Sequence, residues 1–127
     1  MARVVHVNEL PLRGISTQET TGDGSITIVP SDSGVMFVNK YTTGTTTYTL
    51  PTPAAAKGKW FWFYQAQGSA DLKITSGTVN LFIGGGSETA DYMDTNAQNE
   101  GDAAIVVSDG TYFYLLPLTG TWDKGDA

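Results

Sequence analysis

The pattern of apolar and polar residues along the chain predicts a succession of short β-strands. Residues 34–41, 45–50 and 59–65 are rich in β-branched and aromatic residues, and Gly or Pro residues stand between these runs. Further strand-like runs follow the same pattern, at residues 25–30, 71–77, 78–86, 102–110 and 111–118. Because no segment shows a sustained helical period, we expect an all-β protein.

One of these runs contains five consecutive aromatic residues. Neighbouring side chains of a strand point to opposite faces. Phe61 and Phe63 should therefore lie on one face, and Trp60, Trp62 and Tyr64 on the other. Both faces then need cover, one from the core of the domain and the other from a second layer, a partner chain or a ligand.

The number and spacing of the runs refine the fold class. Eight or nine short strands, with turn signals at intervals of about 8–12 residues, are typical of a β-sandwich or barrel. We expect a single antiparallel β-sandwich, jelly-roll-like, with an extended N-terminal arm. Asp109-Gly110 between two apolar alternating runs is a strong hairpin signal.

The expected domain boundaries follow from the polar segments. Residues 1–24 are an arm or lead-in segment, 25–122 the β-sandwich domain and 123–127 a C-terminal tail. Within the domain, residues 87–102 are polar, and we interpret them as a surface loop. The N-terminal residues have no long apolar stretch, which does not favour a secretory signal.

Composition and charge exclude several classes of function. The chain has 127 residues, no cysteine and a formal net charge of -6. The first 64 residues hold five basic and four acidic residues, whereas the rest hold two basic and nine acidic ones. An acidic chain without clustered Lys and Arg does not favour a nucleic acid or an anionic membrane as partner.

Candidate catalytic and metal-binding residues are few. His6 is the one histidine, and no nucleophile elbow accompanies it. Several carboxylates between Glu88 and Asp102 could pair or hold a cation, but water should screen them in a polar loop. The spacing from Asp94 fails the EF-hand pattern, which leaves a non-standard Ca²⁺ site in 88–102 as an open alternative. We expect no enzyme, no catalytic residue, no cofactor and no small-molecule substrate.

The aromatic residues are the main candidates for function. They could form a sugar-binding platform, anchor a subunit interface or fill the second face of a sandwich. The candidates for this role are Trp60, Trp62, Tyr64, Tyr112, Tyr114 and Trp122.

A series of short motifs resembles a known family. The series runs Asp32-Ser33-Gly34, then the T-L-P-x-P motif of residues 49–53, then an aromatic strand after Gly58. It continues with the S-D-G-T-aromatic motif of residues 108–112 and the G-x-W motif of 120–122. In this order the motifs resemble the small β-sandwich decoration, or cement, proteins of tailed bacteriophages, over roughly residues 25–122.

The resemblance implies a virion structural protein on the outer surface of a phage capsid, made in the cytoplasm of the bacterial host. Such a protein would bind the major capsid protein as a homotrimer and stabilise the capsid, with Trp60, Trp62, Tyr64, Tyr112 and Tyr114 at the trimer interface or in layer packing. The alternative is a carbohydrate- or receptor-binding module of a phage fibre or tail protein.

The N-terminal arm is the candidate for contact with the capsid. It is apolar and mildly basic, and an extended segment can add to an exposed sheet edge. The expected capsid-binding residues are Arg3, Val4, Val5, Val7, Leu10, Leu12 and Arg13.

Overall fold

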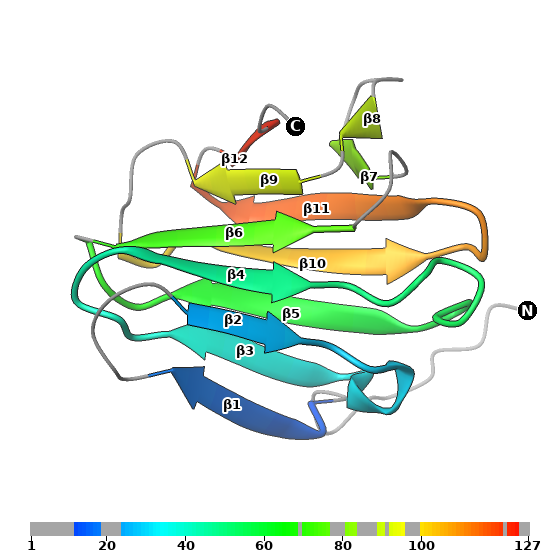
Figure 1. Cartoon of the computed structure of the whole chain (residues 1–127), viewed down its shortest axis with the longest axis horizontal. Coiled ribbons are helices and arrows are strands. Elements are labelled where there is room, and N and C mark those ends of the chain that lie inside the picture. The colour runs from blue at the N-terminus through cyan, green and yellow to red at the C-terminus, as the bar shows by residue number, and fades with distance from the viewer. Residues whose placement is uncertain are drawn as a thin grey trace, which may run out of the picture.

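The computed structural model describes residues 12–18, 24–68, 70–76, 81–83, 89–90, 92–95, 100–120 and 122–124. These residues form an all-β structure of two mixed sheets (Figure 1). The larger sheet, sheet A, has the strand order β1 (Gly14–Gln18), β3 (Val35–Asn39), β5 (Trp60–Gln65), β10 (Ala103–Ser108), β11 (Phe113–Thr119), β7 (Leu81–Ile83) and β8 (Thr89–Ala90). The smaller, sheet B, has the order β12 (Trp122–Lys124), β9 (Tyr92–Thr95), β6 (Asp71–Thr75), β4 (Thr45–Thr49) and β2 (Gly24–Thr27).

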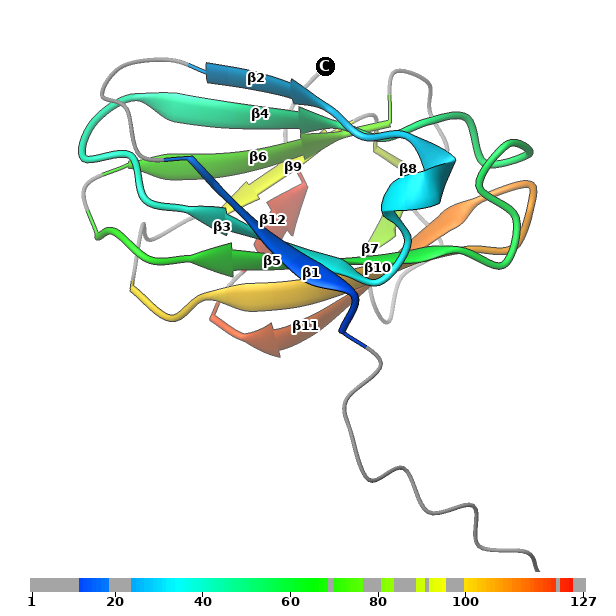
Figure 2. The ribbon, with the colours of Figure 1, turned by 90° about the horizontal axis from the view of Figure 1, so that it is seen from below.

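The first six strands alternate between the two sheets. Strands β1, β3 and β5 lie side by side in sheet A, and β2, β4 and β6 lie side by side in sheet B (Figure 2). Successive strands of one sheet are therefore separated by a strand of the other, and they run in parallel. Strand β7 also pairs in parallel with β11.

The expectation of a purely antiparallel fold is thus wrong. Gly and Pro residues between two strands signal a change of direction, but they do not say which sheet the next strand joins. Antiparallel pairing joins β5 to β10, β7 to β8, β6 to β9 and β9 to β12, and it also occurs where the chain turns back within sheet A, between β10 and β11. There the Asp109-Gly110 hairpin is confirmed, with Gly110 at a φ of 97° and Asp109 N donating to Tyr112 O at 3.1 Å.

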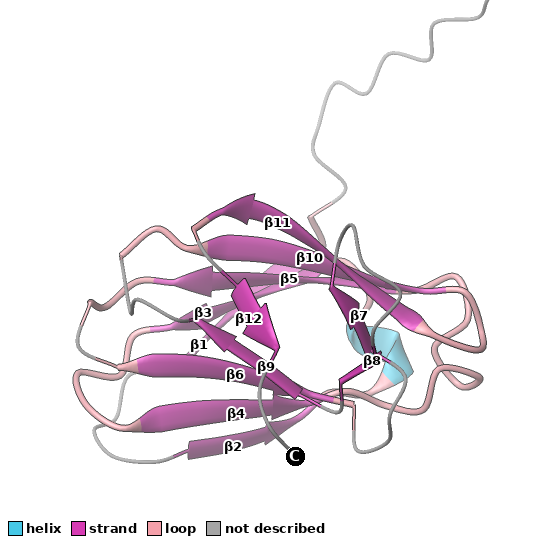
Figure 3. Ribbon diagram, turned by 90° about the horizontal axis from the view of Figure 1, so that it is seen from above, coloured by secondary structure: helices cyan, strands magenta, loops and turns pink. Residues whose placement is uncertain are grey.

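The two sheets pack face to face on one hydrophobic core, which Figure 3 shows edge-on as the space between two layers. Phe61 and Phe63 of β5 are almost fully buried there, as the alternation predicts. The ring of Tyr48, from β4, packs against Phe63 with the ring centroids 5.4 Å apart. The other large side chains that are fully buried are Phe113, Ile28, Leu72, Ile74, Leu81, Leu115, Gln65 and Val106.

A buried polar network also joins the sheets. Asn39 of β3 donates from Nδ2 to Gln65 Oε1 at 2.8 Å and to Asp71 O at 3.0 Å. Its Oδ1 accepts a hydrogen bond from Thr46 Oγ1, in sheet B, at 2.8 Å. Asn39, Thr46 and Gln65 are completely buried, so the network satisfies polar groups that water cannot reach.

Three segments differ from their predicted roles. The polar segment 87–102 is not simply a loop, because it contributes β8 and β9, and β9 pairs with β6 and β12. Part of the lead-in segment forms β1, which pairs with β3. The predicted tail of residues 123–127 contributes Asp123 and Lys124 to β12, which begins at Trp122, a residue buried in the core. In each case pairing with a neighbouring strand satisfies the backbone of a segment that is polar in composition.

Candidate functional site

The outer face of sheet A is the most unusual surface of the described structure. Its side chains form rows across neighbouring strands, and one row runs across five strands from β1 to β11. The members of this row are Ile15, Met36, Trp62, Ile105 and Leu116. Two further rows flank it, made of Trp60, Val107 and Tyr114, and of Thr17, Val38 and Tyr64.

We call these three rows the apolar face. None of its members carries a charge, and most are only partly covered. Leu116 is 49% exposed and Tyr64 is 38% exposed. Leu118, further along β11, is 49% exposed as well. Large apolar patches of this kind on a protein surface are typical of binding sites for other proteins or ligands.

Two tryptophans lie at the centre of the apolar face. The rings of Trp60 and Trp62 pack against each other with centroids 5.4 Å apart and planes tilted by 56°. The Trp62 indole Nε1 is buried and has no hydrogen-bond partner in the described part of the chain. The two rings therefore pack against each other and are largely apolar, properties that suit an anchor in an interface.

The turn motifs found in the sequence hold the backbone at the start of β5. Ser33 Oγ accepts a hydrogen bond from Trp60 N at 3.1 Å, and Gly34 N donates to Trp60 O at 2.8 Å. Asp32 closes the short helix η1 (Pro30–Asp32) by accepting from Val29 N at 3.0 Å. The D-S-G motif is thus a structural device that fixes the position of Trp60.

The other two motifs meet at the same end of the fold. Ser108 Oγ, from the S-D-G-T motif, donates to Pro53 O of the T-L-P-x-P motif at 2.8 Å. Gly58 N donates to Ser108 O at 2.9 Å, and Ser108 N donates to Lys59 O at 3.0 Å. Motifs distant in sequence therefore build one rigid end of sheet A.

The β10–β11 turn adds a polar rim to this end. Asp109 Oδ1 accepts from Tyr112 N at 2.7 Å and from Thr111 N at 2.8 Å, and its Oδ2 accepts from Tyr114 Oη at 2.7 Å. The hydrogen bond from Tyr112 N, followed by those from Tyr114 and Thr111, lowers the pKa of the Asp109 carboxyl. The Asp109 carboxylate in turn raises the pKa of the Tyr114 phenol.

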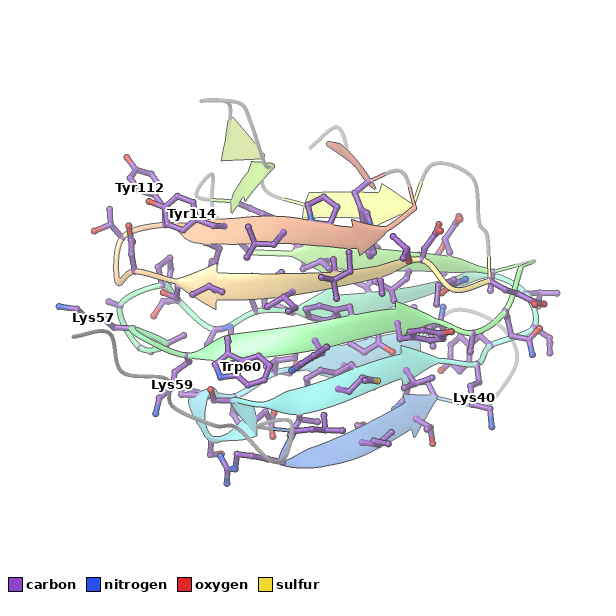
Figure 4. The ribbon with its side chains drawn as sticks, turned by 180° about the vertical axis from the view of Figure 1, so that it is seen from behind. Lys40, Lys57, Lys59, Trp60, Tyr112 and Tyr114 are labelled. Carbon is purple, nitrogen blue, oxygen red and sulfur yellow. The ribbon has the colours of Figure 1, made fainter. Side chains whose placement is uncertain are left out.

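Two exposed lysines lie beside this rim. Figure 4 shows Lys57, Lys59, Trp60 and the two tyrosines at one end of the strands, whereas Lys40 lies at the opposite end. The stem of Lys57 covers the turn, since a Cβ built on Gly110 would be 3.0 Å from Lys57 Cδ.

The structure brings most of the predicted interface residues together. Trp60, Trp62, Tyr64 and Tyr114 lie on the apolar face, and Tyr112 lies in the turn beside it. Trp122 does not belong to this surface, because it is buried and donates from Nε1 to Thr119 O at 3.1 Å.

Sequence reasoning missed the apolar residues that widen the face and the two lysines at its end. The missed apolar members are Ile15, Met36, Val38, Ile105, Val107 and Leu116. A signal was present in residues 103–107, where a continuous apolar run indicates a strand covered on both faces.

The predicted arm is only partly described. Arg3, Val4, Val5, Val7 and Leu10 lie outside the described residues. Leu12 is half-buried, and Arg13 donates from Nη1 to Ser31 O and Ser33 O at 3.3 and 3.2 Å. Arg13 is thus tied to the η1 turn, at the same end of sheet A as Lys57.

The candidate catalytic and metal-binding residues do not form a site within the described ranges. His6, Glu88 and Asp91 fall outside them, while Glu100 is exposed. Asp102 is 3% exposed, so the expectation of a carboxylate open to water is wrong for this residue. Among the residues described, no three His, Asp or Glu side chains gather as metal ligands, and no helix has the length and apolarity to span a membrane.

Comparison of the chain with protein-family models, with curated proteins and with solved structures finds no match in any of the three. Function therefore has to be inferred from the apolar face and the turns beside it.

Proposed function

We propose that the chain is a non-enzymatic virion structural protein that decorates a phage capsid as a homotrimer. The observation that carries this proposal is the apolar face, an uncharged surface across five strands of a chain with a net charge of -6. Each of the eleven residues of this face covers about 4.8 Å across the sheet and about 6.6 Å along the strand, which gives a face of roughly 350 Å² in plan. The largest apolar patch of a monomeric protein is typically about 300–600 Å² and is often functional, so this face supports a binding surface.

The partner in this proposal is a second and a third copy of the chain. Three copies can place their apolar faces around a three-fold axis, and each copy then covers its neighbours. Trp60, Trp62, Tyr64 and Tyr114 would lie in these contacts, and Tyr112 at their rim. Trp and Tyr are the residue types enriched at the centres of such interfaces.

The proposal includes a single β-sandwich with a jelly-roll-like outline. Some of its strand pairs are parallel, where an ordinary jelly roll has antiparallel pairs. The D-S-G, T-L-P-x-P and S-D-G-T motifs support the proposed family resemblance, because all three build the end of sheet A that holds Trp60. In the virion the trimer would sit on the outer capsid surface and bind the major capsid protein.

The oligomeric mass, with and without purified capsids, tests the proposal. Light scattering should give a mass three times the 13.5 kDa of one chain, and the protein should co-sediment with capsids of the encoding phage that lack it. Acrylamide should quench the fluorescence of Trp60 and Trp62 poorly, since the trimer covers both rings. A monomer whose tryptophans are quenched by acrylamide and protected by sugars would contradict the proposal and favour the carbohydrate-binding alternative.

Truncation tests the proposed arm separately. Because β1 begins at Gly14, removal of residues 1–11 leaves sheet A complete. We expect the truncated protein to remain a trimer and to lose capsid binding. Unchanged binding would show that Arg3, Val4, Val5, Val7 and Leu10 do not hold the capsid.

A further inference from the structure

Three of the seven basic residues of this acidic chain lie at one end of sheet A. Arg13, Lys57 and Lys59 all belong to segments at the start of β1 or β5, and the parallel register of β1, β3 and β5 brings these starts together. We call these three residues the basic end. Figure 4 shows Lys57 and Lys59 there, with Lys40 at the far end of the same strands.

The two lysines of the basic end are held on a rigid support. The backbone between Pro53 and Trp60 is fixed by hydrogen bonds to Ser108 and by the bond from Lys59 N to Ala56 O at 2.8 Å. Gly58, at a φ of 75°, allows the sharp turn between the two lysines. A fixed backbone limits the entropy that the lysines lose when they bind a partner.

The ammonium groups themselves are available. Lys57 and Lys59 are exposed, and neither forms an ion pair with a carboxylate in the part of the chain that the structure describes. The described acids nearest in the fold, Asp32 and Asp109, accept hydrogen bonds from their own turns. The two lysines of the basic end therefore carry positive charge that no ion pair with a described carboxylate neutralises, while Arg13 is bonded to Ser31 O and Ser33 O.

Aromatic side chains border this charge. Trp60 follows Lys59 directly, and Tyr112 lies in the turn that Lys57 covers. A rigid surface with a few cations beside aromatic rings is typical of protein interfaces, where a polar rim surrounds an apolar centre.

We propose that the basic end is a docking surface for an acidic surface of a partner protein. This inference rests on the proposed function, because a three-fold axis along the strands of sheet A would place the basic ends of three copies at one pole. The chain also enters β1 at this end, so the proposed capsid-binding arm starts from the same pole. The partner at that pole is then the capsid, and the opposite end of sheet A faces solvent.

The number and kind of the cations favour a protein as the partner. Binding to nucleic acid needs many phosphate contacts along a continuous basic track, and the rest of this acidic chain would repel it. A few fixed lysines match separate carboxylates, which a lysine can meet as a point charge. Charge pairs at the rim of an interface mainly raise the association rate and make binding sensitive to salt.

Charge removal at the basic end tests this proposal. The double variant Lys57→Gln/Lys59→Gln is compared with Lys40→Gln/Lys73→Gln, which removes the same charge from the far end and from sheet B. Thermal melting first establishes that both variants fold like the wild type. Binding is then measured to poly-L-glutamate, to heparin and to purified capsids, at about 50 and about 300 mM NaCl.

We expect wild-type protein to bind poly-L-glutamate at low salt and the basic-end variant to bind at least about tenfold more weakly. The control variant should bind like the wild type. Capsid binding should fall in the same order, and salt should weaken the wild type more than the basic-end variant.

Each other outcome has a distinct meaning. No binding of the wild type to poly-L-glutamate, or equal binding of the two double variants, overturns the docking surface even if the protein decorates capsids. Binding to heparin but not to poly-L-glutamate overturns an acidic protein as the partner. Loss of poly-L-glutamate binding in the basic-end variant, with no capsid binding by the wild type, supports the docking surface and contradicts the proposed function.

Discussion

The two sheets present different side chains on their outer faces. Sheet A exposes tryptophan, tyrosine, isoleucine, leucine and methionine side chains across five strands. On β2, β4 and β6 of sheet B, the outward positions are instead Ser25, Thr27, Thr45, Thr47, Thr49, Asp71, Lys73 and Thr75. Both sheets are strongly apolar on their inner faces, so the difference concerns only the surfaces that do not contact the common core.

This comparison separates folding from association. A threonine surface is compatible with water and also with β-structure, because Thr is β-branched and polar. The aromatic surface of sheet A adds nothing to the packing between the two sheets. This surface therefore supports the proposal that a partner binds to sheet A from outside.

The largest change in oligomeric mass is expected when a charge is placed on the outer face of sheet A, compared with a charge on the outer face of sheet B. Trp62→Glu should dissociate the proposed trimer, with an affinity loss of at least about 100-fold, because a charge cannot be buried between apolar faces without a partner. Thr47→Glu, the control on sheet B, should leave the mass unchanged. Light scattering across a dilution series measures both.

A second variant protects this test against loss of folding. Leu116 is half-exposed on the same face, so Leu116→Lys should fold and should also weaken the trimer. If both sheet A variants keep the wild-type mass, the apolar face is not the subunit interface.

The next largest effect is a loss of stability when the buried hydrogen-bond network between the two sheets is broken. Asn39→Ala leaves Thr46 and Gln65 without one of their buried partners. The free energy of unfolding should fall by about 2–4 kcal/mol. Urea unfolding measures this change, and Thr27→Ala on the exposed side of β2 should change the stability by less than about 0.5 kcal/mol.

The sequence predicts the features of this structure that depend on local geometry, including the two faces of β5. Alternation places Phe61 and Phe63 in the core and Trp60, Trp62 and Tyr64 outside, because the period of a strand depends on local geometry alone. The hairpin at Asp109-Gly110 is predictable for the same reason, since its turn is defined by adjacent residues.

The remaining features depend on contacts between residues distant in sequence. Nothing local shows that β3 pairs with β5 rather than with β4, because the choice is made by the packing of both sheets. Asp102 belongs to a polar segment that the sequence predicts to be a loop, and its burial results from packing against neighbouring strands. Lys57 and Lys59 are ordinary in sequence, and only folding brings Lys57 to the turn that contains Gly110 and Tyr112.

A smaller effect is expected from the Asp109 hydrogen bonds at the rim of sheet A. These bonds hold the folded-state pKa below the ordinary value of 3.8, so the ionised carboxylate favours the folded state. The stabilisation is complete above the unfolded-state pKa and disappears as the pH falls through the lower folded-state value.

Asp109→Asn tests this pH dependence. The variant should melt below the wild type at pH 7, and the difference in Tm should vanish at strongly acidic pH. A Tm difference that stays constant down to strongly acidic pH would show that the carboxylate charge is not what stabilises the turn.

The smallest change in stability is expected from a substitution in the core between the two sheets. Burial raises the pKa of the Tyr48 phenol, and its Oη is buried without a hydrogen-bond partner among the described residues. Tyr48→Phe removes this unsatisfied group and keeps the ring. Stability should stay the same or rise by up to about 1 kcal/mol in urea unfolding. A loss of more than about 1 kcal/mol would reveal a partner for the hydroxyl.

The alternation of the first six strands between the sheets also sets the order in which the chain can fold. No two strands that follow each other in β1 to β6 are paired, so this half cannot start from a local hairpin. The β10–β11 hairpin forms its contacts within a short stretch of chain and is the natural first step. The parallel strands then have to close long loops before they gain any contact, so folding should be slow, on the millisecond to second scale of β proteins with distant pairings. Until those contacts form, the aromatic strand β5 has neither sheet neighbour in place, and an exposed strand of this kind carries a risk of aggregation during folding.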